Sequence, residues 1–128
     1  MISYARAPDV EERAKKIVEL VHLDHLDKSR LYFYRSKGTK SRHVQARIHG
    51  LGRIWFDALA MEPRYIIEVI SEEFDKLGVE EKDKVIIHEL MHIPKGFSGG
   101  FVPHRGKINR RTVEAMFKRY AEASKNSS

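Results

Sequence analysis

The sequence predicts an α+β fold in which a small three-stranded sheet carries helices on one side. Aromatic and β-branched residues are concentrated in three short segments, which predicts strands at 31–34, 44–48 and 64–70. Apolar residues recur three and four positions apart in longer segments, which predicts helices at 9–26, 52–60, 80–92 and 113–120. No linker or internal repeat is visible in the 128 residues, so we expect one domain over 1–128 with a short disordered tail at about 122–128.

The first predicted elements begin and end at residues that start or stop regular structure. Asp9 and Glu12 follow Pro8 and form a pair that resembles a capping box for the first helix. A turn at 37–40 separates the first two strands, and Gly50 ends the second.

Stop signals also delimit the second half of the chain. Pro63 ends the preceding helix, and Ser71 is predicted to cap a single helical turn after the third strand. Pro94 disfavours helical geometry in the residue before it, so the long helix should end just after His92. A glycine-rich loop follows at 95–107.

Composition excludes several classes of protein. The chain has no cysteine, so disulfides and thiolate metal sites are excluded. It has no run of about 18 apolar residues and no apolar N-terminal core typical of a signal peptide, so we expect a cytoplasmic protein without a membrane span. The net charge of +6 permits an acidic partner such as nucleic acid, although the basic residues are spread along the chain. Abundant Glu, Lys and Arg with few amides are typical of thermophiles.

The segment His88-Glu89-Leu90-Met91-His92 has the spacing of a zinc site with an adjacent base. Residues four apart lie on one face of a helix, so His88 and His92 can bind one metal ion. Glu89 lies about 100° around the axis, where its carboxylate can take a proton from a metal-activated water. The predicted helix is apolar nearly all round, and a metal would satisfy polar side chains that are otherwise costly to bury.

A catalytic zinc site needs a third protein ligand. His104, twelve residues after His92 in the glycine-rich loop, is the first candidate, and Glu114 on the last helix is the alternative. The longer metzincin motif is absent, because Lys95 and Ser98 stand where it requires Gly and His.

Three further features bear on substrate binding. Cations gather after His104, and we expect Arg105 and Arg110 to bind a substrate carboxylate or phosphate, with a solvated basic face as the alternative. The strand at 64–70 is expected to pair with an extended substrate backbone. Glu68 within that strand is expected at a solvent-facing edge position, or else as a hydrogen-bond partner of a metal-binding histidine.

Several segments occur in a specific order along the chain. They are Tyr65-Ile66-Ile67-Glu68-Val69-Ile70-Ser71 with Phe74, Ile87-His88-Glu89-Leu90-Met91-His92-Ile93-Pro94, Gly99-Gly100 and Pro103-His104. Together they resemble the putative phage metallopeptidases, a family of archaeal and viral proteins similar to the SprT-like zincins.

The resemblance covers roughly residues 44–120. It implies a minimal zincin-like fold in which His88, His92 and His104 bind zinc and Glu89 is the general base. SprT-like relatives with known roles cut proteins crosslinked to DNA. The family is also similar to minigluzincins, whose third ligand is a Glu, and Glu114 would take that role here.

The leading hypothesis is therefore a zinc-dependent metallopeptidase that acts on a protein or peptide substrate. A second hypothesis is a zincin-fold binding or regulatory protein with structural zinc, possibly associated with DNA. A third is a nucleic-acid-binding module in which the motif is incidental.

Overall fold

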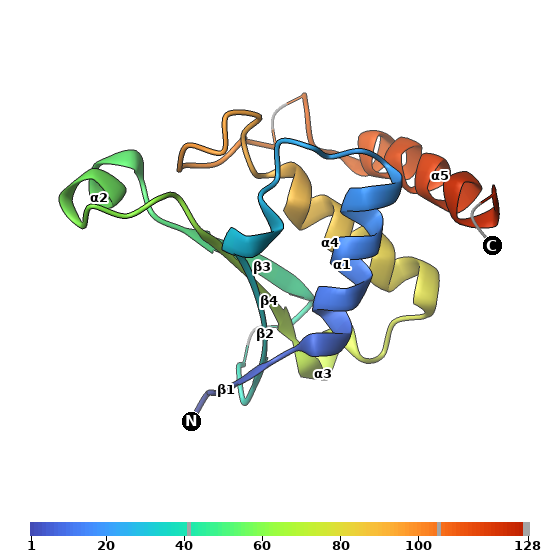
Figure 1. Ribbon diagram of the computed structural model, residues 1–128. Coiled ribbons are helices and arrows are strands. Elements are labelled where there is room, and N and C mark those ends of the chain that lie inside the picture. Colours follow the sequence, from blue (N-terminus) through green and yellow to red (C-terminus); the bar gives the residue numbers. More distant parts are fainter. Residues whose placement is uncertain (41, 105, 127–128) are drawn as a thin grey trace.

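The computed structural model describes residues 1–40, 42–104 and 106–126 (Figure 1). The predicted mixture of helices and strands is confirmed. In chain order the elements are β1 (Ser3–Arg6), α1 (Pro8–Leu20), the 3₁₀ turn η1 (Lys28–Arg30), β2 (Leu31–Lys37), β3 (Ala46–Gly50), α2 (Arg53–Ala58), β4 (Tyr65–Ile70), α3 (Ser71–Phe74), α4 (Val79–Met91) and α5 (Arg110–Asn126).

The sheet of the described residues has four strands in the order β1-β2-β4-β3, rather than the three predicted. β2 and β4 are parallel central strands, and β1 and β3 pair antiparallel to them as the two edges. The missed strand β1 has four exposed residues and no alternation of apolar and polar side chains. It is extended because it pairs with β2, and no local pattern predicts such a pairing.

Strand order also corrects the expected site of substrate pairing. Both edges of β4 are already hydrogen-bonded, one to β2 and the other to β3. The prediction that the strand at 64–70 pairs with a substrate is therefore wrong for this fold. β3 pairs with β4 on one side, and no described strand pairs with its other edge, which leaves that edge available to a substrate.

The core lies between the sheet and the helices α1 and α4, and α5 packs behind them (Figure 1). Its fully buried side chains come from every layer, including Ile17 of α1, Phe33 of β2, Ile67 of β4 and Leu90 of α4. Burying side chains of this size stabilises the fold by about 1.5–3 kcal/mol each. These contacts fix α4, which carries the His-Glu-Leu-Met-His motif, against the β3 and β4 side of the sheet.

Both predicted helix caps are wrong, and one arginine explains both errors. α1 begins at Pro8 without a side-chain cap, and α3 also has none. Arg35 of β2 instead donates from Nη2 to Asp9 at 2.8 Å and from Nη1 to the hydroxyl of Ser71 at 3.0 Å. A charged donor from the neighbouring strand takes the oxygens that local sequence would assign to the helix ends.

α1 ends at Leu20, six residues before the predicted end. His22 adopts a left-handed conformation with φ of 55°, and the amide of Leu23 donates to the carbonyl of Val18 at 3.0 Å. This arrangement is a Schellman C-cap, in which glycine is the usual left-handed residue. The end was missed because a histidine occupies that position.

The second half of the chain follows the predicted boundaries more closely. α4 ends at Met91 with His92 as its C-cap, as Pro94 predicts. α5 continues to Asn126, so residues 122–126 are helical and the predicted tail is wrong over that range; residues 127–128 lie outside the described residues. No helix of the described chain is long and apolar enough to cross a lipid bilayer.

Glu68 occupies neither of its two predicted environments. It is 2% exposed in the middle of the sheet, where its carboxylate accepts from the Ser36 hydroxyl at 2.5 Å and from Arg47 Nε at 3.1 Å. His49 Nε2 lies 2.7 Å from the same carboxylate. Burial opposes ionisation, but these hydrogen bonds outweigh it and hold the pKa of Glu68 below its ordinary value.

Candidate metal centre

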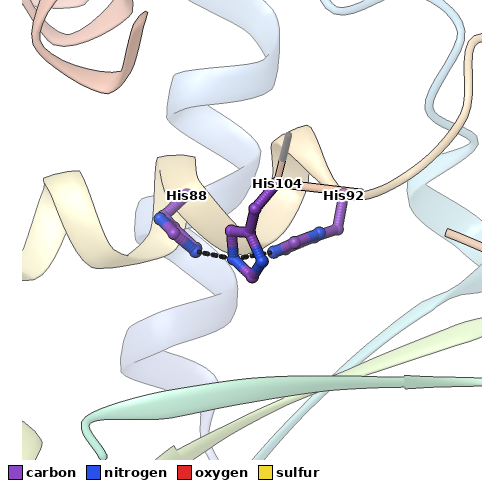
Figure 2. A group of neighbouring side chains, drawn as sticks. All are labelled: His88, His92 and His104. Carbon is purple, nitrogen blue, oxygen red and sulfur yellow. Dashed lines mark hydrogen bonds between the residues drawn. The ribbon is translucent and has the colours of Figure 1, made fainter. Parts of the chain in front are cut away.

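His88 lies in the last turn of α4 and His92 is the C-cap of that helix, and both rings point toward β3 (Figure 2). His88 is half-buried, and His92 is buried with 8% of its surface exposed. They share one helix face because four residues complete slightly more than one turn. The buried apolar residues Ile86, Ile87 and Leu90 of α4 face the core, whereas the two histidines line the cleft beside β3.

His104 completes the group from the loop that precedes α5. Its Nε2 lies 3.1 Å from Nε2 of His88 and 3.1 Å from Nε2 of His92 (Figure 2). The three ring nitrogens lie within 4.8 Å of one another and form one group of three possible metal ligands. The structure therefore brings together the three histidines that the sequence predicts.

The backbone of Val102 orients His92. Its carbonyl oxygen lies 2.8 Å from Nδ1 of His92, and its amide donates to the carbonyl of His92 at 2.7 Å. A carbonyl oxygen only accepts, so Nδ1 carries a proton, and in the neutral ring Nε2 is then the nitrogen that can bind a metal. Metal-binding histidines are commonly oriented by such a bond. Sequence reasoning missed Val102 because a backbone carbonyl leaves no trace in residue type.

Aromatic packing fixes the loop that carries His104. The hydroxyl of Tyr65 donates to the carbonyl of Gly100 at 2.9 Å, and the Tyr65 ring meets the edges of Phe97 at 5.3 Å and Phe101 at 5.9 Å between centroids. Phe97 is buried and has an unfavourable φ of 48°. Its burial between loop and sheet compensates that strain and holds the loop over the end of α4.

One of the three histidines, His88, is shifted toward the protonation state that a metal requires. Burial lowers the pKa of His88, and the neighbouring charges of His92 and His104 lower it further. A neutral imidazole is the form that donates a lone pair to a metal ion. Burial and proximity thus favour the binding-competent state of His88.

Glu89 lies beside this group and has a different environment. It is 8% exposed, and no hydrogen-bond partner of its carboxylate is found in the described part of the chain. Burial raises its pKa to about 7. A carboxylate with a pKa near neutral can accept a proton and release it again at physiological pH.

A cleft of about 730 Å³ opens onto the histidines and Glu89. It runs between β3, α4 and α5, and its walls include Ala46, Ile48, Lys84, Val85 and Glu114. A volume of this size accommodates a few residues of extended peptide. Lys84 was not singled out from the sequence, although its position four residues before His88 places it on the same helix face.

The remaining predicted site residues are placed as follows. Glu114 lines the cleft, but its carboxylate lies 3.0 Å from Nζ of Lys84 and does not join the histidine group. Arg110 is exposed at the start of α5 and lines the same cleft. Arg105 lies outside the described residues.

The donor set and its spacing fit a tetrahedral metal ion. Bonds of about 2.0–2.1 Å at tetrahedral angles place ligand nitrogens roughly 3.3 Å apart. The two separations of 3.1 Å from His104 are close to that value. Three histidine nitrogens also leave one coordination position toward the cleft.

Comparison with known proteins agrees with this geometry. A family model described as putative phage metallopeptidase matches residues 2–122. The chain belongs to this family. The resemblance stated from the sequence is thereby confirmed, and the family description supports a metal-dependent hydrolase; the similarity to SprT-like zincins stays a prediction. No curated protein and no solved structure matches the chain.

Proposed function

We propose that this protein is a zinc-dependent peptidase that hydrolyses peptide bonds in the cleft beside β3. The observation that carries the proposal is the convergence of three histidine nitrogens beside a buried, unpaired glutamate at the floor of an open cleft. Membership of a metallopeptidase family supports the same reaction class.

His88, His92 and His104 are the proposed zinc ligands. Three imidazoles and no thiolate suit zinc, and three protein ligands are the number that catalytic zinc sites use. When bound, zinc would polarise the substrate carbonyl and lower the pKa of a water to about 7. The ion pair between Lys84 and Glu114 supports a site with an open coordination position. It holds the Glu114 carboxylate, which could otherwise serve as a fourth ligand, away from the histidines.

Glu89 is the proposed general base. Its carboxylate accepts a proton from the attacking water and then gives that proton to the amine of the departing peptide. The surrounding apolar packing, which raises its pKa to about 7, makes both transfers accessible near neutral pH.

The free edge of β3 is the proposed binding site for an extended substrate. An added strand would place its scissile bond along the cleft wall formed by residues 44–48, facing the end of α4. Arg110 is exposed and has no ion pair among the described side chains, so it can bind a substrate carboxylate at the far wall.

The test compares wild-type protein, Glu89→Gln and His88→Ala for zinc content and for cleavage of an unfolded protein substrate. Wild type should bind about one zinc per chain and cleave. Glu89→Gln should keep the zinc and lose activity by at least about a hundredfold, because only the proton acceptor is removed. Full cleavage by Glu89→Gln would refute the role of Glu89, and zinc content unchanged in His88→Ala would refute the site.

A further inference from the structure

The face of the sheet opposite the helices carries tyrosine and arginine side chains that the peptidase proposal does not use. Figure 1 shows α1, α4 and α5 on the other side of the sheet. Phe33 points into the core, so its neighbours Tyr32 and Tyr34 on β2 point to this outer face. In the antiparallel register of β1 with β2, Arg6 pairs with Tyr34 and Tyr4 pairs with Ser36. We call Tyr4, Arg6, Tyr32, Tyr34 and the adjoining Arg64 the tyrosine face.

Aromatic rings on this face are accessible and are accompanied by arginine. Tyr4 is 62% exposed, and Tyr32 and Tyr34 are half-buried. The guanidinium of Arg6 lies 5.6 Å from the ring centroid of Tyr32 and 5.1 Å from that of Tyr34. Arg64 Nη1 donates to the hydroxyl of Tyr32 at 2.5 Å.

The charge of the tyrosine face is positive. Neither Arg6 nor Arg64 forms an ion pair with a carboxylate in the described residues. The acidic residue nearest to them in the sheet, Glu68, is buried and is already neutralised by Arg47 and His49. The chain as a whole carries a net charge of +6. A polyanion is therefore complementary to this surface.

Ring spacing favours unpaired bases over a duplex. Residues two apart on a strand lie about 6.6–6.8 Å apart, twice the 3.4 Å rise of stacked bases in a duplex strand. Tyr32 and Tyr34 thus suit bases that are separated and stacked singly on protein rings, as in other single-strand binding sheets.

A neighbouring hollow extends the tyrosine face. It has a volume of about 570 Å³ and is lined by Tyr32 and Arg64 together with Phe56, Ile66 and Phe101. Its apolar walls can receive a base that is turned away from the strand, while Arg64 stays at its rim for a phosphate.

We infer that the tyrosine face binds single-stranded nucleic acid. Bases stack on Tyr32 and Tyr34, and Arg6 and Arg64 pair with the flanking phosphates. Arg6 is exposed, so it can leave the rings when a base arrives and still reach the neighbouring phosphate. This surface is separate from the histidine cleft, and its binding does not depend on metal.

The probe is a fluorescein-labelled oligothymidylate of about 15 nucleotides, and the measurement is fluorescence anisotropy between about 50 and 200 mM NaCl. Wild type should bind it more tightly than the corresponding duplex, with affinity that falls as salt rises. Chelation of metal should leave the affinity unchanged. The inference would be overturned if wild type failed to bind the oligonucleotide at low salt or preferred the duplex. It would also be overturned if His88→Ala lost oligonucleotide binding.

Matched variants locate the binding. Arg6→Gln/Arg64→Gln should weaken binding at least tenfold and reduce the salt slope by about 1.4, because each phosphate contact on a single strand contributes about 0.7. Lys16→Gln/Lys118→Gln removes the same charge from exposed positions of α1 and α5 and should change binding less than about twofold. Equal losses in the two double variants would show diffuse attraction only and would overturn the inference.

Ring chemistry is tested at Tyr34, whose hydroxyl forms no hydrogen bond with another described side chain. Tyr34→Phe should bind within about twofold of wild type, and Tyr34→Leu should lose about fivefold or more, because one stacked base is removed. Equal binding by the two variants would overturn the stacking claim. If circular dichroism shows that Tyr34→Leu is unfolded, the inference is tested by the binding of Arg6→Gln/Arg64→Gln alone. Tighter binding of polyglutamate than of the oligonucleotide would assign the face to an acidic protein instead.

Discussion

The loop that carries His104 contains a glycine with little room for a side chain. Gly99 has a φ of +95°, and a Cβ atom added to it would lie 3.1 Å from the carbonyl oxygen of Leu51 and 3.1 Å from the ring of Phe56. Its neighbour Gly100 has a φ of +75°, but an added Cβ would meet nothing within 4 Å. Gly100→Ala therefore introduces backbone strain alone, whereas Gly99→Ala introduces backbone strain together with steric contact.

The two substitutions should differ in cost. Both place an L-residue in the left-handed region, which costs about 1–2 kcal/mol. Gly99→Ala must also displace backbone near the start of α2, and overpacking of this kind costs about 1–3 kcal/mol more. We therefore expect Gly100→Ala to lose about 1–2 kcal/mol and Gly99→Ala about 2–5 kcal/mol of unfolding free energy.

Urea unfolding with a metal chelator measures this difference, and zinc titration of the same proteins measures its effect on the site. Because only Gly99→Ala must shift the loop away from Leu51 and Phe56, it should also weaken zinc binding more than Gly100→Ala does. Equal stability losses and equal zinc affinities would refute the claim that contact with α2 positions the loop.

Two further predictions concern single hydrogen-bonded groups. Tyr65→Phe removes only the bond to the Gly100 carbonyl, so it should cost about 1 kcal/mol in urea unfolding and weaken zinc binding; no change in either would contradict the anchoring role. Glu68 has a depressed pKa in the folded protein, because hydrogen bonds from Arg47, Ser36 and His49 outweigh its burial. Its stabilising contribution is therefore present above the unfolded pKa of about 4.5 and is lost as pH falls through the folded value. Unfolding free energy should drop between pH 7 and pH 3.5 more in wild type than in Glu68→Gln, and equal drops would contradict this.

Local patterns predicted the elements that hold the metal centre. The helix ending near His92 follows from apolar spacing and from Pro94, both of which act within a few residues. The convergence of His88 and His92 follows from helical geometry alone. His104 could be proposed because a glycine-rich loop that leaves the end of a helix can fold back over it.

Features set by distant contacts were not predictable. β1 is extended because it pairs with β2, and its own four residues are all exposed. Strand order placed β4 in the centre and β3 at the edge, which moved the expected substrate strand. Glu68 is buried because Arg47 and His49, about twenty residues earlier in sequence, pair with it across adjacent strands.

The central claim is that His104, rather than Glu114, completes a three-histidine zinc site. The direct measurement is calorimetric zinc titration of metal-free wild type, His104→Ala and Glu114→Ala. Wild type and Glu114→Ala should each bind about one zinc with similar affinity, because the Glu114 carboxylate pairs with Lys84. His104→Ala should bind at least about a hundredfold more weakly, since a ligand itself is removed. Intact zinc affinity in His104→Ala together with lost affinity in Glu114→Ala would contradict the account.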